Sequence, residues 1–135
     1  MERRTRSYLA KDMSVLWIMP YHSGVSGLRP YRTKIWERYL HALYFGRAFY
    51  WLSEEKLVPV HFEPYSLGWI SREEYDEDRQ GFSWNEFERF SPSLRNPEPG
   101  DVVRITELQT IWRSFRRIGP FTLPRAKLWS LPSRI

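Results

Sequence analysis

The spacing of apolar residues changes at Gly46, and this change restricts the fold more than any other feature of the chain. Before Gly46, apolar side chains recur every three or four residues, which is typical of one face of a helix. After it, short runs rich in aromatic and β-branched residues predict strands. The helical stripe consists of Tyr31, Ile35, Trp36, Tyr39, Leu40, Leu43 and Tyr44, and we expect Arg32, Lys34, Glu37 and Arg38 to face water.

The two apolar runs that follow Gly46 predict a hairpin. Residues 48–52 and 57–62 are separated by the polar segment 53–56, which has the composition of a turn. Pro59 cannot donate a backbone hydrogen bond, so it belongs at a strand start or at a sheet edge. A helix followed by a hairpin predicts a mixed α/β fold.

The rest of the chain predicts further helices and strands. Ser71 and Glu74 match a capping box, which predicts a short helix through the acidic stretch toward Asp78. Thr110 is a helix N-cap residue, and the helix that it predicts runs to about Ile118. The other predicted elements are strands over residues 65–70, 102–109 and 125–131, and a basic arm or short helix over residues 1–11.

Length and composition predict one folded domain. A chain of 135 residues with 17% aromatic residues can bury a single core. We expect a basic lead-in over residues 1–13 and one domain over residues 14–135, built as a mixed sheet flanked by helices. The absence of cysteine excludes disulfides and thiolate metal sites. No apolar run is long enough to predict a membrane span, and we expect a cytoplasmic protein.

Charge is divided along the sequence. The formal net charge is +5, yet the centre of the chain is acidic from Glu73 to Asp78. Arginine suits phosphate and carboxylate groups, so the basic ends predict an acidic or polyanionic partner. The arginines toward the ends are Arg3, Arg4, Arg6, Arg113, Arg116, Arg117, Arg125 and Arg134.

His22 is the strongest candidate for a catalytic residue. It follows an apolar run directly and opens a loop rich in glycine and serine, and an imidazole in such a place can act as a general base near neutral pH. A loop histidine bonded to a backbone carbonyl is the structural alternative. The other two histidines, His41 and His61, lie in patterned segments where packing accounts for them.

Four ordered pieces of the sequence resemble the toxin-activating lysine acyltransferases, which have the Gcn5-related N-acetyltransferase fold. The first is Trp17-Ile-Met-Pro-Tyr-His22, similar to that family's segment ending in the catalytic histidine, and the second is the helix and hairpin that follow. The third is Leu67-Gly-Trp-Ile-Ser71 before the acidic stretch, and the resemblance implies that Trp69 lies in the core of the central sheet. The fourth is Gly100-Asp101 leading into Ile105-Thr-Glu107, similar to the strand with a catalytic aspartate.

The resemblance implies transfer of an acyl group to a protein lysine. His22 would be the general base and Glu107, in place of the family's aspartate, would orient it. The donor would be acyl carrier protein or acyl-CoA, with no bound cofactor and no metal. The splayed strand edges of this fold and the start of the Thr110 helix are the candidate oxyanion sites. Residues Arg113, Arg116 and Arg117 would form the docking surface for an acidic carrier protein.

Two other functions fit the same residues. The terminal arginines could bind nucleic acid by neutralisation and stacking together with the aromatic residues interleaved with them, which are Trp112, Phe115, Phe121 and Trp129. A catalytically inactive acyltransferase-like scaffold that binds a host protein, such as a virus or mobile-element effector, is the third class. The acidic stretch lacks the glycine and oxygen spacing of a calcium loop, so a solvated helix face explains it better than a cation site.

Overall fold

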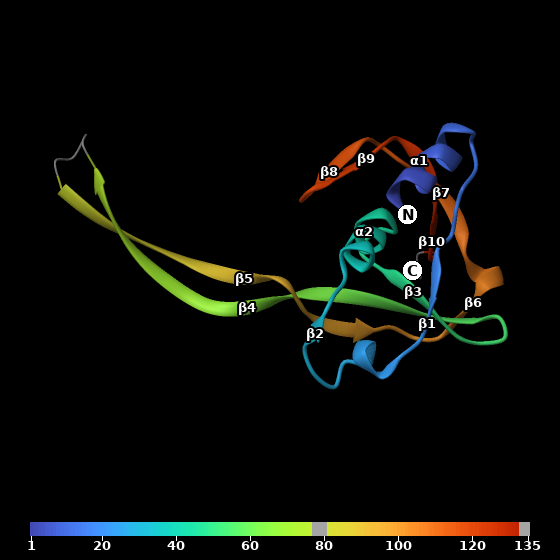
Figure 1. Ribbon diagram of the computed structural model, residues 1–135, viewed down its shortest axis with the longest axis horizontal. Coiled ribbons are helices and arrows are strands. Elements are labelled where there is room, and N and C mark those ends of the chain that lie inside the picture. Colours follow the sequence, from blue (N-terminus) through green and yellow to red (C-terminus); the bar gives the residue numbers. More distant parts are fainter. Residues whose placement is uncertain (77–80, 133–135) are drawn as a thin grey trace.

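A computed structural model describes residues 1–76 and 81–132 of the chain (Figure 1). Its main sheet has the strand order β1-β3-β4-β5-β2, and β6 pairs with the start of β4. β1 pairs with β3 in parallel, whereas the other pairs are antiparallel. The strands are β1 (Ile18–Pro20), β2 (Tyr31–Arg32), β3 (Ala48–Ser53), β4 (Lys56–Asp76), β5 (Gly81–Pro99) and β6 (Val103–Arg104).

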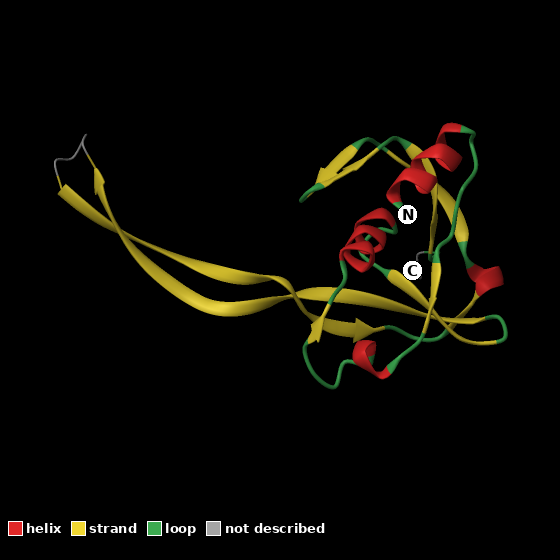
Figure 2. Cartoon of the chain, in the orientation of Figure 1, coloured by secondary structure: helices red, strands yellow, loops and turns green. Residues whose placement is uncertain are grey.

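Two small antiparallel sheets lie across the body from the main sheet (Figures 1 and 2). β7 (Gln109–Arg113) pairs with β10 (Ala126–Ser130), and β8 (Arg116–Ile118) pairs with β9 (Phe121–Leu123). The helical elements are α1 (Glu2–Ala10), α2 (Ile35–Leu43) and the 3-10 turns η1 (Ser23–Val25) and η2 (Ile105–Glu107). The mixed α/β prediction is therefore confirmed. The predicted arrangement of a sheet flanked by helices is not confirmed. In the described part of the chain, α2 packs between the main sheet and the small sheets.

The helix predicted before Gly46 is confirmed as α2. Tyr39, Leu40 and Leu43 are buried in one core cluster with β3, β4 and the small sheets, as the three-to-four spacing predicts. Two positions depart from the expected faces: Ile35 is exposed, and Glu37, which was expected to face water, is fully buried at 0% exposure.

The predicted hairpin is confirmed as β3 and β4. Tyr50 pairs with Val58, and Ala48 pairs with Val60. These residues meet across the two strands and are buried together in a second core cluster. Pro59 lies within β4, opposite Phe49, which is inside the strand and not at its start. The predicted strand over residues 125–131 is confirmed as β10.

Three sequence-based elements are wrong in the described residues. Ser71 does not begin a helix, since residues 71–76 continue β4 and pair with residues 81–86 of β5. Thr110 does not cap a helix, because residues 109–113 form β7. Residues 102–109 hold only the short β6 and the turn η2 before β7 begins. In the first two cases cross-strand pairing outweighs a local capping preference. Glu77, Asp78 and Arg134 lie outside the described residues.

Beyond the body, β4 and β5 continue as a two-stranded ribbon that projects from the molecule (Figure 1). We call residues 66–76 and 81–90 the arm. At its base the register shifts between Pro64 and Ser66 and again between Ser66 and Gly68. Such irregularities bend a ribbon and increase its twist. Gly68 has a φ of +100°, a backbone conformation that glycine adopts without steric strain.

The amino-terminal segment is tied to the body by polar contacts. The hydroxyl of Tyr44 donates to the carbonyl of Val15 and accepts from the backbone N–H of Trp17, both at 2.8 Å. The Trp17 indole donates to the hydroxyl of buried Thr5 in α1. The predicted lead-in is therefore a helix attached to the domain. Within the described residues, no helix has the length and apolar character needed to cross a membrane.

Replacing Tyr44 by phenylalanine tests this attachment. The variant leaves the Val15 carbonyl and the Trp17 N–H without their partner, so we expect the free energy of unfolding to fall by about 1–3 kcal/mol in urea titrations. Tyr8→Phe, at an exposed position, is the control and should change it by less than about 0.5 kcal/mol. Equal stability of the two variants would contradict the attachment.

Candidate functional site

His22 lies between β1 and η1, where it is exposed. The centroid of its ring is 5.3 Å from that of Tyr31 and 5.8 Å from that of Tyr50. The histidine therefore lies on the surface over a pair of tyrosine rings, as expected for the end of a strand that opens a loop.

The two tyrosines beside His22 bind a buried carboxylate. The Tyr31 hydroxyl donates to Glu37 Oε1 at 2.8 Å, and the Tyr50 hydroxyl donates to Glu37 Oε2 at 2.5 Å. The backbone N–H of Lys34 donates to Oε1 at 2.9 Å. Burial, together with the hydrogen bond to Glu37 and its charge, raises the pKa of both tyrosines. Three donors thus satisfy a carboxylate that would otherwise be costly to bury.

Glu107, the expected partner of His22, lies elsewhere. It ends the turn η2, and its carboxylate accepts a hydrogen bond from the backbone N–H of Arg104 at 3.1 Å. The same residue lines a cavity of about 730 Å³ together with His61. No hydrogen bond joins His22 to Glu107 among the contacts of the described residues. Through the tyrosines, His22 is instead adjacent to Glu37.

The predicted carrier-docking residues do not form one group. Arg113 is buried: its guanidinium donates to the carbonyls of Ala42 and Leu43 at the end of α2 and lies 5.0 Å from the centre of the Phe45 ring. Burial and the nearby charge of Arg116 lower the pKa of Arg113. It stabilises the carboxyl end of α2 and is not free to bind a carrier.

The other predicted docking residues differ from Arg113 in their burial. Arg116 and Arg117 are exposed on β8. Thr110 is half-buried in β7 opposite Trp129, and with no helix beginning there the expected oxyanion site is wrong.

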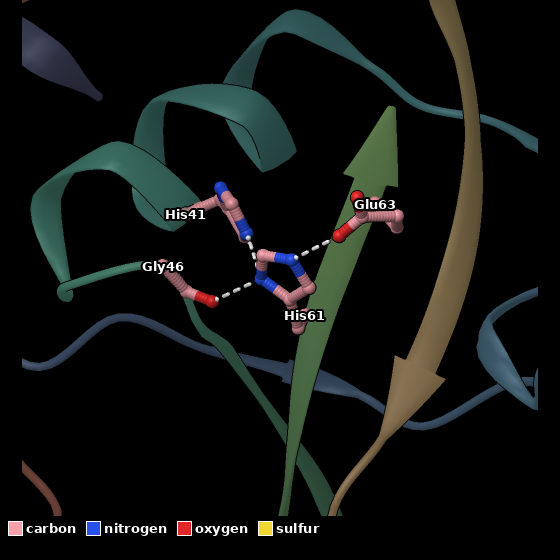
Figure 3. A network of polar contacts seen from close by, with 4 residues as sticks. All are labelled: His41, Gly46, His61 and Glu63. Carbon is pink, nitrogen blue, oxygen red and sulfur yellow. Dashed lines mark hydrogen bonds and ion pairs between the residues drawn. The ribbon is translucent and has the colours of Figure 1, made fainter. Parts of the chain in front are cut away.

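The histidines that packing was expected to explain form a polar network (Figure 3). His61 Nδ1 lies 2.9 Å from the carbonyl oxygen of Gly46 and 2.9 Å from Nε2 of His41. Its other nitrogen, Nε2, lies 2.9 Å from Glu63 Oε2. A carbonyl only accepts, so Nδ1–H of His61 donates to Gly46, and His41 Nε2 then faces that proton as an acceptor.

The pKa values of the two histidines are shifted in opposite directions. Burial, the charge of His61 and the charge of Arg95 lower the pKa of His41 to about 4, against a smaller opposite effect of Glu63. Burial also lowers the pKa of His61. The hydrogen bonds to Gly46 and Glu63 and the charges of Glu63 and Glu98 outweigh it, so its net pKa is raised. His41 is therefore neutral near pH 7.

Strand register brings a second carboxylate to this network. Glu98 of β5 pairs with His61 of β4, and Glu63 lies two residues further along β4, on the same face as His61. One ligand atom from each of these three side chains lies within 4.8 Å of the other two. His61 and Glu98 also line the 730 Å³ cavity, whose charged walls include Arg47, Asp101 and Glu107. The alternation His61-x-Glu63 is visible in the sequence, but Glu98 joins them only through the register.

The arm carries two exposed tryptophan side chains. Trp69 is 69% exposed, so its expected place in the core is wrong, and Trp84 is 67% exposed. Trp69 pairs with Glu88, and Glu73 pairs with Trp84, so both indoles lie on one face of the ribbon, roughly 13 Å apart along it. Phe90 is exposed as well, and so is Phe87, which pairs with Ile70 and therefore lies on the opposite face. A face of this kind is typical of an interaction surface.

Comparison of the chain with protein-family models, with curated proteins and with solved structures found no match.

The lowered pKa of His41 predicts a pH dependence of stability. The folded chain binds this proton with a pKa of about 4 and the unfolded chain with a pKa near 6.5. Between these values the unfolded state binds more protons, so stability falls as pH falls through this window. We expect wild type to lose roughly 2 kcal/mol more than His41→Gln between pH 7 and pH 4.5, measured by urea unfolding.

His22→Gln is the control for this titration, because the exposed His22 has no comparable burial. Its stability should follow the wild-type pH curve. Parallel curves for wild type and His41→Gln would contradict the neutral His41.

Proposed function

We propose that this protein is an assembly protein, in which the arm of one copy docks on a basic surface of a second copy. This surface, which we call the basic face, includes Arg6 and Arg125. The observation that carries the proposal is the arm, which projects from the body (Figure 1) and holds two exposed tryptophans. A two-stranded ribbon is only marginally stable in water without a third strand or a packing partner. A surface that covers Trp69 and Trp84 would stabilise the arm.

Charge supports a second copy as the partner. The arm holds five Asp or Glu and two Arg, whereas the whole chain has a net charge of +5. The residues outside the arm therefore carry a net charge of +8. An acidic, aromatic arm and a basic body are complementary, and such complementarity guides association and register. The exchange of identical arms between two copies forms a closed dimer.

The basic face is formed where the two arginine-rich ends of the chain meet. Arg6 of α1 and Arg125, just before β10, line one cavity of about 500 Å³. The Arg125 guanidinium lies 4.8 Å from the centre of the Trp112 ring, and this indole is exposed beneath it. Arg6 also pairs with Glu2 at 2.9 Å, an exposed contact that contributes little to stability. Stacked arginine and tryptophan match the acidic and aromatic groups of the arm.

Sedimentation and light scattering of the purified chain test the assembly. We expect concentration-dependent dimers that dissociate as salt is raised from 50 to about 500 mM, since screening weakens the charge attraction. Trp69→Ala/Trp84→Ala should weaken the dimer about tenfold or more. Leu28→Ala, which removes an apolar side chain that is 87% exposed outside the arm, is the matched control and should leave it unchanged.

Two results would defeat the proposal. One is a wild-type chain that stays monomeric at all concentrations and salt levels. The other is an arm variant that dimerises as well as Leu28→Ala does. A monomer that binds nucleic acid through Arg6 and Arg125 would favour the polyanion-binding function instead.

The second candidate function is lysine acylation, favoured by the place of His22. It is exposed at the end of β1 beside Tyr31 and Tyr50, which hold the Glu37 carboxylate. In this proposal His22 removes the lysine proton, and the amine nitrogen then attacks the acyl thioester and releases the thiol. The hydroxyls of the tyrosines and the charge of Glu37 would orient the imidazole ring of His22, which lies above them.

An acylation assay separates this candidate from assembly. Incubation with acyl carrier protein or acyl-CoA and candidate proteins should add an acyl mass to a lysine, and His22→Ala should lower the yield at least about a hundredfold. Glu107→Gln is the control and should act like wild type, because its carboxylate bonds to Arg104. The same yield from His22→Ala as from wild type would exclude His22 as the base.

A further inference from the structure

We propose that His61, Glu63 and Glu98 form a binding site for a first-row divalent cation, with Zn²⁺ the best match. The proposal concerns the body of the protein and is independent of assembly through the arm. It rests on three observations: the spacing of the ligand atoms, the orientation of the imidazole and the cavity beside them.

The spacing of the ligand atoms suits one ion. Zn²⁺ binds imidazole nitrogen and carboxylate oxygen at roughly 2.0–2.2 Å, so two ligand atoms on one tetrahedral ion lie roughly 3.3–3.6 Å apart. His61 Nε2 and Glu63 Oε2 are 2.9 Å apart. With an oxygen of Glu98, they form a group in which all ligand atoms lie within 4.8 Å of one another. Small side-chain rotations would place all three on a common ion.

The backbone orients His61 as it does in many metal sites. A ligating histidine usually donates its other ring N–H to a carbonyl or carboxylate, which fixes the tautomer. Here Nδ1–H of His61 donates to the Gly46 carbonyl, so the lone pair of neutral His61 lies on Nε2 and faces Glu63 (Figure 3). Two acceptors at 2.9 Å repel each other unless a cation or a proton lies between them.

The ligands stand on a rigid part of the main sheet. β4 is paired with β5 through His61 and Glu63, and it is paired with β3 as far as Val60, the residue before His61. His61 and Glu63 share one face of β4, and Glu98 is directly opposite His61. The sheet fixes the relative positions of the ligands before any ion binds.

The cavity of about 730 Å³ gives access to the site. His61 and Glu98 form part of its wall, and the carboxylates of Asp101 and Glu107 lie along it, with Arg47 as a basic residue of the same wall. Three protein ligands on one side leave coordination positions open to water or a substrate oxygen. The nitrogen and carboxylate set favours Zn²⁺, Mn²⁺ or Co²⁺ over ions that prefer thiolates, which this chain lacks.

Calorimetric titration with Zn²⁺ tests the site on the full chain after treatment with EDTA. We expect one equivalent to bind at pH 7.5 with a dissociation constant in the micromolar range or below. Glu63→Gln and Glu98→Gln change exposed side chains and should each weaken binding at least tenfold. His22→Ala removes an exposed histidine that lies beside Tyr31 and Tyr50 and is not among the three proposed ligands, so it should bind as wild type does.

Nitrogen-15 spectra of the histidine rings give a second readout that does not depend on affinity. Zn²⁺ should shift the Nε2 resonance of His61 and leave both resonances of His22 in place. Circular dichroism of Glu63→Gln and Glu98→Gln should match wild type, so that weak binding is not mistaken for unfolding. The proposal is overturned if wild type binds no saturating equivalent, if both glutamine variants bind as tightly as wild type, or if Zn²⁺ shifts His22 alone. In each of these outcomes only a proton joins His61 to Glu63.

Discussion

Pairing of β4 on both of its edges is the constraint on which the rest of the structure depends. Within the body, β4 pairs with β3, β5 and β6, and its residues Leu57, Val58 and Val60 are buried in the core. The same pairing sets Glu98 opposite His61 and carries the strand outward into the arm. One strand thus supports the core, the proposed cation site and the proposed assembly surface.

Two buried charges connect α2 to the sheets on its two sides. Glu37, in the first turn of α2, accepts hydrogen bonds from Tyr31 and Tyr50, while Arg113 of β7 donates to the carbonyls at the end of the helix. Neither charge relies on an ion pair for its burial, since neutral groups satisfy both. In the part of the chain that the structure describes, no buried side-chain nitrogen or oxygen lacks a partner. Polar contacts therefore help to fix the position of α2 on both sides.

The predictable part of this protein is the part governed by local periodicity. The stripe through Tyr39, Leu40 and Leu43 predicts α2, and the two apolar runs after Gly46 predict the hairpin of β3 and β4. Local signals misled where long-range pairing competes with them. Ser71 and Thr110 have the chemistry of helix caps, yet both lie in strands because backbone partners far along the chain were available. For the site, the sequence pointed to His22 and Glu107, which do not bond to each other, and treated His41 and His61 as packing residues.

By itself, the sequence determined a mixed α/β domain without disulfides, the helix before Gly46, the hairpin after it and a chain with basic ends and an acidic centre. These properties follow from residue types and spacing over short distances. Only the tertiary structure decided that Glu37 is buried under two tyrosines, that Arg113 bonds to α2, and that Glu98 meets His61 and Glu63. The physical reason is register: a shift of one residue between β4 and β5 would move Glu98 to the other face of the sheet, and no local pattern specifies that alignment.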